Sequence, residues 1–186
     1  MALRIGSKAP DFKTTDQDGN EISLNGLKGK KFVLYFYPKD MTPGCTAEAC
    51  NLRDNYPALQ KAGYEIFGIS SDNEKSHQKV IAKEKLPFRL LADTNKLVHT
   101  KFGTWVEKSM YGRKYMGTAR VTYVMDANGV IENIIDKVDT RNHAAQILGT
   151  APAPSATPKS ATKKKPAKKA AKPAKKAVKK AAKKRK

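Results

Sequence analysis

The sequence predicts an α/β domain with a mixed central sheet, followed by a disordered C-terminal tail. Short apolar runs typical of buried strands alternate with helix-like stretches through residues 1–149. An Asn128-Gly129 pair separates the last two runs, as in a β-hairpin. From residue 150 onwards acidic residues are absent and large apolar residues almost so, and such a composition cannot build a core.

The individual elements follow from apolar runs and from the residues that interrupt them. The expected strands are residues 12–15, 21–24, 31–37, 64–70, 88–91, 119–125 and 130–135. The expected helices are residues 43–61, 73–83, 96–101 and 142–148, and residues 103–117 are expected to be irregular. Residues 31–37 are apolar almost throughout, as in a strand covered on both faces.

Proline, glycine and small polar residues mark the helix ends. Thr42 is expected to be the N-cap of the helix that follows, with Pro43 in the first helical position. We expect that helix to bend or break at Pro57 and to end at Gly63. Asp72 is expected to cap the next helix.

Charge is distributed very unevenly along the chain. Residues 151–186 contain 14 Lys, one Arg and no acid, which gives +15, and this leaves 37 − 15 = 22 basic against 17 acidic residues, or +5, in residues 1–150. We therefore expect one folded domain at 1–149 and a basic tail at 150–186. The chain contains no apolar run of about 18 residues and its start does not resemble a signal peptide, so we expect a cytoplasmic protein with no membrane partner.

Cys45 is a candidate nucleophile because of its expected place in a helix. If Thr42 is the N-cap, Cys45 is the third helical residue, near unpaired backbone N–H groups and the positive end of the helix dipole. Both favour a thiolate, which can attack a peroxide O–O bond and become a sulfenic acid. The position alone is equally consistent with a small buried cysteine that has no chemical role.

Cys50 follows five residues later. In an intact helix the two Cα atoms would lie about 8.6 Å apart, whereas a disulfide needs roughly 4.4–6.8 Å. A disulfide between Cys45 and Cys50 therefore requires the helix to unwind, and a core-facing Cys50 is the other interpretation. Three scattered histidines, His77, His99 and His143, are expected at the surface, and no metal site or cofactor is expected.

The segment around Cys45 resembles the active-site signature of peroxiredoxins. Pro38-x-x-x-Thr42-x-x-Cys45 carries that resemblance, and Thr42-Pro43-Gly44-Cys45-Thr46-x-Glu48-x-Cys50 is similar to the bacterioferritin-comigratory, or Q-type, branch. The likeness continues through Trp105, residues 111–117, Arg120 and residues 126–129, so it covers about residues 3–149.

This resemblance implies a thioredoxin-like fold and a thiol peroxidase that acts on hydroperoxides in antioxidant defence. It makes Cys45 the peroxidatic cysteine and Cys50 the resolving one, with thioredoxin or a similar dithiol as the reductant. Thr42 and Arg120 would hydrogen-bond the peroxide oxygens and the thiolate, and Pro38 would shield the pocket. The branch is often monomeric, so a monomer is expected.

Some positions stay open or depart from the family pattern. Glu48 is either a partner of Arg120 or an ordinary acid of the first helical turn. The residues at 121–123 are Val-Thr-Tyr, where the family often has a small hydroxyl residue followed by Thr-Phe, and Met41 stands at a loop position that is more often polar.

The tail has a degenerate Lys/Ala/Pro pattern that resembles the tails of linker histones and histone-like bacterial proteins. Its charge suits non-specific binding to nucleic acid through residues 151–186, with a nucleoid-associated location as the consequence. It has no aromatic residue to stack on bases. Two alternatives remain: the tail only increases solubility, or the whole protein is a nucleic-acid-binding protein whose body is a sensor or passive carrier.

Overall fold

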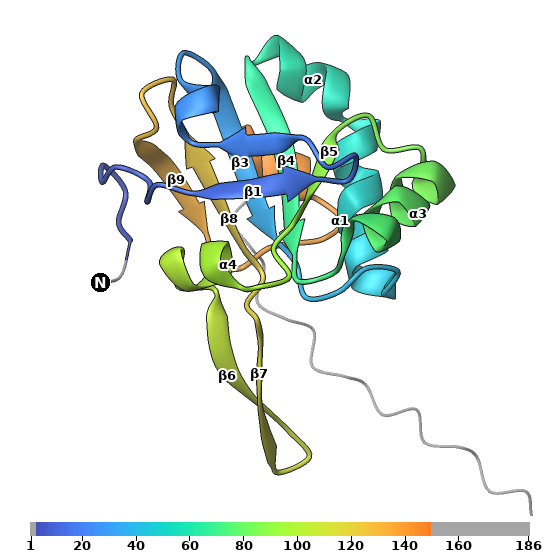
Figure 1. Ribbon diagram of the computed structural model, residues 1–186. Helices are drawn as coiled ribbons and strands as arrows, with labels where there is room; N and C mark the ends of the chain where they lie inside the picture. Colours follow the sequence, from blue (N-terminus) through green and yellow to red (C-terminus); the bar gives the residue numbers. More distant parts are fainter. Residues whose placement is uncertain (1–2, 150–186) are drawn as a thin grey trace, which may run out of the picture. The chain divides into compact units, whose positions relative to one another are not determined.

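A seven-stranded mixed sheet forms the centre of residues 3–149, the part of the chain that this computed structural model describes (Figure 1). Its strands stand in the order β2-β1-β5-β4-β3-β8-β9. They are β1 Lys13–Asp16, β2 Glu21–Ser23, β3 Lys31–Phe36, β4 Tyr64–Ser70, β5 Arg89–Ala92, β8 Val121–Met125 and β9 Ile131–Ile135. The mixed sheet predicted from the sequence is confirmed, whereas the predicted tail at 150–186 lies outside the described residues.

The apolar run of β3 occupies the middle of the sheet. β3 pairs in parallel with β4 on one side and antiparallel with β8 on the other. Residues 32–36 are all buried, because both faces of the sheet are covered. β8 and β9 form the predicted Asn-Gly hairpin, with a register irregularity between Val124 and Met125.

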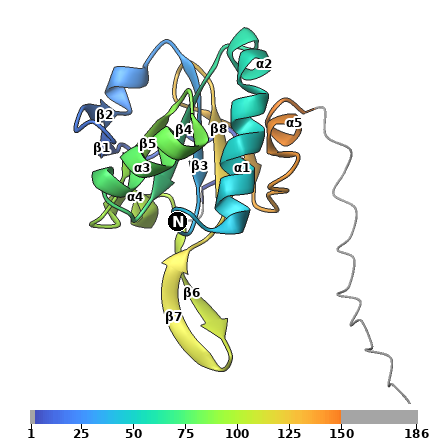
Figure 2. The same ribbon diagram turned by 90° about the vertical axis from the view of Figure 1, so that its right-hand side faces the viewer.

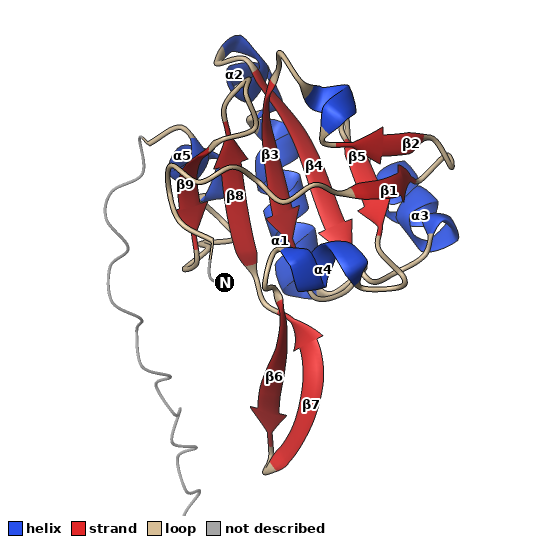
Figure 3. Cartoon of the chain, turned by 60° about the vertical axis from the view of Figure 1, so that its left-hand side comes forward, coloured by secondary structure: helices blue, strands red, loops and turns tan. Residues whose placement is uncertain are grey.

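Helices cover the two faces of the sheet unequally. They are η1 Asn25–Leu27 (a 3₁₀-helix), α1 Pro43–Asp54, α2 Tyr56–Lys61, α3 Glu74–Glu84, α4 Leu97–Lys101 and α5 His143–Ile147. Buried residues of α1, α2, α3 and α5 share one core cluster, and those of η1 and α4 share the other. In Figure 3 α1 and α2 lie behind the sheet and α4 lies in front of it.

The start and the break of the long predicted helix agree with the sequence. Thr42 is the N-cap residue by backbone conformation and Pro43 is the first helical residue, so Cys45 is the third. The Thr42 side chain makes no capping hydrogen bond, however, and its Oγ1 donates to the carbonyl of Lys39 instead (3.1 Å). The break falls at Asn55, because Pro57 has no N–H and is accommodated only in the first turn of a new helix.

Two sequence predictions about local structure were wrong. The cap of α3 is Asn73, whose side chain accepts from the Ser76 N–H. Asp72 instead accepts from the backbone N–H of Asp40, in the loop before α1. Residues 103–117 are not irregular, because β6 Trp105–Met110 and β7 Arg113–Thr118 form a two-stranded hairpin that projects from the sheet (Figures 1 and 2). A hairpin that projects need not bury a whole face, so it lacks the alternating pattern that would reveal it.

The prediction of three surface histidines was also wrong. His77, His99 and His143 are all fully buried, and each contacts a buried carboxylate. Among residues 3–149 no helix is long and apolar enough to cross a membrane.

Candidate active site

Cys45 lies near the start of α1, just after the loop that connects it to β3. The chain leaves β3, turns through residues 37–42, and enters α1, so the cysteine is placed at the carboxyl end of a central strand and in the first turn of a helix. Its side chain is only 5 % exposed and is a free thiol. Cys45 is thus the third residue of α1, as the sequence predicted, in the turn whose N–H groups have no partner within the helix.

Arg120 reaches the same place from a distant part of the sequence. It directly precedes β8, and the register Phe36↔Val121 places it beside the end of β3. Its Nη2 donates a hydrogen bond to Cys45 Sγ at 3.3 Å, and its Nη1 pairs with Glu48 Oε2. A fixed cation at this distance stabilises a thiolate. The sequence prediction that Arg120 lies beside Cys45 thus agrees with the geometry.

Glu48 is Arg120's partner and is fully buried, which favours the first of its two sequence-based interpretations. Burial raises the pKa of Glu48 to about 7, and the nearby Arg120 charge limits the rise. Burial by itself would lower the pKa of Arg120, but Glu48 and Cys45 outweigh it and raise that pKa. Arg120 therefore stays charged between Glu48 and Cys45.

Thr42 and Pro38 lie in the loop that leads to Cys45. Both are half-buried. The Thr42 hydroxyl is bound to the carbonyl of Lys39, and Pro38 occupies the bend directly after β3. Both residues thus lie on the approach to the first turn of α1, and no hydrogen bond connects either one to Cys45 Sγ.

A buried polar cluster that the sequence did not reveal anchors the same loop. Asp40 accepts hydrogen bonds from Tyr37 Oη (2.8 Å) and contacts His77 Nδ1 at 2.9 Å, while its backbone N–H donates to Asp72 Oδ2 (2.8 Å). Burial alone would raise the pKa of Asp40, but the hydrogen bond from His77 and those from Ser76 and Tyr37 bring it below its ordinary value. The loop before Cys45 is therefore held to α3 through His77 and to the segment before α3 through Asp72.

Cys50 points away from this arrangement and towards α3. It is a free, half-buried thiol whose Sγ donates to Glu84 Oε2 at 3.5 Å. Burial raises the pKa of the Cys50 thiol; Arg53 opposes that rise, and Glu84 adds to it. The structure thus brings Cys45, Arg120 and Glu48 together, while Cys50 remains a protonated thiol held by another helix.

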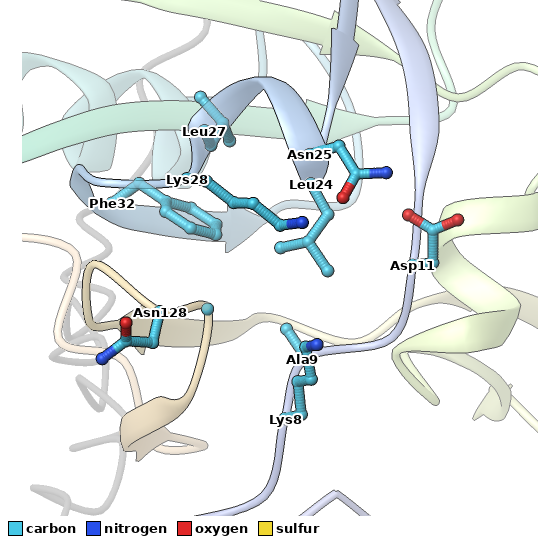
Figure 4. Close-up of a pocket in the computed structure, with 10 residues that line it drawn as sticks. Lys8, Ala9, Asp11, Leu24, Asn25, Leu27, Lys28, Phe32 and Asn128 are labelled. Atoms are coloured by element: carbon cyan, nitrogen blue, oxygen red, sulfur yellow. The ribbon is translucent and has the colours of Figure 1, made fainter.

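Two pockets bear on where a small substrate would enter. A narrow, mostly apolar pocket between α1, α3 and the sheet is bordered by Cys45, together with Tyr35, Met41, Val80 and Leu90. A second pocket of about 240 Å³ is lined by Leu24, Lys28, Phe32 and Asn128 (Figure 4). Because the second pocket lies against the other core cluster and contains no predicted site residue, the first is the relevant one.

Two further polar residues near Cys45 escaped the sequence analysis. Lys108 of β6 donates to the carbonyl of Thr118; burial and the charge of Arg120 lower the pKa of Lys108, and Cys45 opposes that fall. His143 of α5 contacts Glu48. Neither is near Cys45 in the sequence, and neither belongs to a spaced motif, so only the tertiary structure associates them with the site.

Comparisons with known proteins agree with this architecture. Residues 5–134 match the model of the AhpC/TSA family. The chain is 46% identical over 149 residues to a protein of Coxiella burnetii named as a putative peroxiredoxin bcp, covering 80% of this chain and 99% of that one. It is 44% identical over 146 residues to peroxiredoxin Bcp of Escherichia coli K12, covering 78% and 94%.

A solved structure extends the likeness to the fold. The bacterioferritin comigratory protein of Xanthomonas campestris superposes with a TM-score of 0.72 at 33% identity, over 79% of this chain and 94% of that one. The thioredoxin-like fold implied by the sequence resemblance is thereby confirmed. With the family match, the relatives and the fold in agreement, the chain belongs to the AhpC/TSA family as a Bcp/PrxQ-type peroxiredoxin, a thiol peroxidase that reduces peroxides.

Proposed function

We propose that Cys45 is the peroxidatic cysteine and that Arg120 activates it. The observation that carries this proposal is the hydrogen bond of 3.3 Å from Arg120 Nη2 to Cys45 Sγ at the start of a helix. The thiolate attacks the outer oxygen of a hydroperoxide R–O–O–H. An S–O bond forms, the O–O bond breaks, and the RO⁻ group leaves with the electron pair and takes up a proton to become water or an alcohol.

Residues around Cys45 are placed to assist the attack on the peroxide. Arg120 is aimed at the sulfur and carries a fixed charge that stabilises the developing oxyanion. We assign Thr42 to hydrogen bonding of the peroxide and Pro38 to shielding of the pocket, because both lie in the half-buried loop before the first turn of α1. The narrow pocket beside Cys45 is bordered by Tyr35, Val80 and Leu90, and the substrates that we propose are hydrogen peroxide and organic hydroperoxides.

We further propose that Cys50 resolves the sulfenic acid of Cys45. The Cys50 sulfur attacks the Cys45 sulfur, an S–S bond forms, and the hydroxide that leaves combines with the proton of Cys50 as water. Both cysteines belong to α1, so the helix has to unwind before the sulfurs can meet. One chain contains both cysteines, which supports catalysis by a monomer, and thioredoxin or a similar dithiol would reduce the disulfide.

Cysteine variants test this assignment. Cys45→Ser should consume no peroxide, because a serine hydroxyl is not ionised near neutral pH and attacks O–O bonds poorly. Cys50→Ser should react once and then stop at sulfenic acid, with faster over-oxidation. The measurements are peroxide consumption with a thioredoxin system and the mass of the oxidised protein. Turnover by Cys45→Ser would disprove the nucleophile, and full turnover by Cys50→Ser would disprove the resolving role.

A second function concerns the tail. We propose that residues 151–186 bind nucleic acid without sequence preference and hold the enzyme near it in the cytoplasm. The observation is the concentration of charge, +15 in the tail against +5 in the body. Lysine-rich segments bind phosphates through counterion release, and a segment without aromatic residues has no means to stack on bases. Comparison of the full chain with a chain that ends at Gly149 tests this second function.

A further inference from the structure

A line of buried polar groups continues behind Arg120. Glu48 Oε2 pairs with Arg120 Nη1, and the other oxygen, Oε1, lies 3.2 Å from His143 Nδ1 in α5. The second nitrogen of His143, Nε2, lies 2.9 Å from Thr122 Oγ1 in β8. Glu48, His143 and Thr122 are all 0 % exposed. Contacts therefore extend without interruption from Cys45 Sγ to the last helix of the domain.

The contact between Glu48 Oε1 and His143 Nδ1 lies at the centre of this line. Within residues 3–149, neither Glu48 Oε1 nor His143 Nδ1 has a hydrogen-bond partner, although both are buried and the two atoms lie 3.2 Å apart. Buried polar atoms rarely remain without a partner, because water is not there to replace it. The 3.2 Å approach between these two atoms is thus the interaction that each of them has available.

The protonation states of His143 and Glu48 near neutral pH determine which atom of this contact can donate a hydrogen bond. Burial, followed by the charge of Arg120, lowers the pKa of His143 to about 3, while Asp139 opposes the fall, so the ring is neutral. The pKa of Glu48 is about 7. A neutral imidazole has one N–H and one acceptor nitrogen. In the tautomer with its proton on Nδ1, that N–H faces the ionised carboxylate and Nε2 can accept from the Thr122 hydroxyl. In the other tautomer, Nδ1 can accept a hydrogen bond from the O–H of protonated Glu48.

We propose that His143 is a positioning residue for the peroxidase reaction, acting through Glu48 on Arg120. The proposal rests on the proposed role of Cys45. The guanidinium of an arginine is a rigid planar fork, so fixing Nη1 on Glu48 also fixes the direction of Nη2, which meets Cys45 Sγ. His143 in turn fixes the carboxylate plane of Glu48 by contacting the oxygen that Arg120 leaves free.

The other titratable groups around the pair are few. Tyr35 of β3 interacts electrostatically with Glu48 and stacks edge-on against the His143 ring, with ring centroids 6.0 Å apart. Asp139, in the segment before α5, acts on His143. Burial, and then Glu48, raise the pKa of Tyr35 well above its ordinary value, so Tyr35 stays neutral. Glu48 is therefore the member of this cluster whose titration lies nearest to neutral pH.

Three substitutions of His143 separate positioning from packing. In His143→Asn the amide nitrogen replaces Nδ1, so contact with Glu48 is kept and contact with Thr122 is lost. In His143→Gln the amide replaces Nε2, so the opposite contact is kept. His143→Leu removes both. The rate constant for oxidation of Cys45 by hydrogen peroxide would be measured for each full-length variant from pH of about 5.5 to 9, together with the melting temperature.

We expect the three variants to differ in the rate constant for Cys45 oxidation. His143→Asn should stay within about threefold of the native rate, while His143→Gln and His143→Leu should lose about tenfold at pH 7, because small misplacements at a reacting centre are costly. The midpoint of the pH–rate profile near 7 should move upward in these two variants, since loss of a donor to the carboxylate favours its protonated form. Glu48→Gln should abolish that midpoint, and a His143→Gln change added to it should cost little more.

Several outcomes would overturn the proposal. A native rate constant and an unchanged pH–rate profile in His143→Gln would do so. Equal losses of rate in His143→Asn and His143→Gln, in proportion to the fall in their melting temperatures, would do so as well. If His143→Leu does not fold, the comparison of His143→Asn with His143→Gln still tests the proposal. The pH–rate profile of Glu48→Gln tests the role of Glu48 without any change at residue 143. Failure of the proposed function is recognised separately, because Cys45→Ser would then still reduce peroxide.

Discussion

At the scale of single residues, Arg120 does two things with one rigid group. One end of the guanidinium donates to Cys45 Sγ and the other pairs with Glu48. A lysine at this position would supply the charge without the fork, because its ammonium is a point charge on a flexible stem. Gly44 lies beside the guanidinium: a Cβ at that position would be 3.5 Å from Arg120 Nη2, an ordinary van der Waals contact.

Replacement of Arg120 should therefore slow the reaction with peroxide far more than it affects folding. We expect Arg120→Gln to reduce the rate constant for Cys45 oxidation about 10²–10³-fold, the usual cost of removing a donor aimed at developing negative charge. Stopped-flow kinetics measures this loss. Arg113→Gln is the matched control, because Arg113 is an exposed arginine in β7. Similar rates in the two variants would contradict the assignment.

At the scale of elements, α1 carries both Cys45 and Cys50 and is held at each end by contacts with other segments. The loop before it is held by Asp40 through His77 and Asp72. Its last turn is held to α3, because Arg53 Nη1 donates to the backbone carbonyl of Glu84 at 2.7 Å. Cys50 donates to the carboxylate of the same glutamate. A disulfide between Cys45 and Cys50 has to break some of these contacts as well as helical hydrogen bonds.

Oxidation should consequently loosen α1. We expect hydrogen exchange in residues 42–54 to become faster when the Cys45–Cys50 disulfide forms, because the disulfide does not fit an intact helix. Mass spectrometry of the reduced and oxidised protein provides the comparison, with β3 as an internal control that should remain protected. Equal protection of α1 in both states, with the disulfide confirmed, would disprove the unwinding.

At the scale of the whole molecule, charge and chemistry occupy different parts of the chain. The tail carries +15 in 36 residues and the remaining 150 residues carry +5. Cys45, Cys50 and Arg120 all lie in the body. Catalysis and the proposed nucleic-acid binding are therefore expected to be separable by truncation.

Removal of residues 150–186 should abolish DNA binding and leave peroxidase activity nearly unchanged. With six phosphates neutralised, the affinity of the full chain should fall about a thousandfold between roughly 50 and 200 mM salt, because counterion release weakens as salt rises. Mobility shifts across a salt series, with DNA of two unrelated sequences, measure it. Comparable affinity in the truncated chain, or a shallow salt dependence, would return the tail to the alternative role of a solubilising segment.

The sequence by itself determined the elements whose signals are local. The apolar run of residues 31–37, Pro43 after Thr42, Pro57 and the Asn-Gly turn predicted β3, the start of α1, its break and the β8–β9 hairpin, because each depends on the intrinsic preferences of a few neighbouring residues. The spaced motif from Pro38 to Cys50 likewise indicated the family and its candidate cysteines. The β6–β7 hairpin escaped because it lacks an alternating pattern.

Only the tertiary structure decided which distant side chains meet at Cys45. Arg120 was expected there through family resemblance, but the role of Glu48 stayed open, and His143 was placed at the surface although it is fully buried. The reason is physical: a buried polar residue is tolerated because partners from other strands and helices satisfy it. The side chains that contact Glu48 are those of Arg120 and His143, which lie 72 and 95 residues further along the chain. Such pairing depends on strand order and helix packing, which no local pattern encodes.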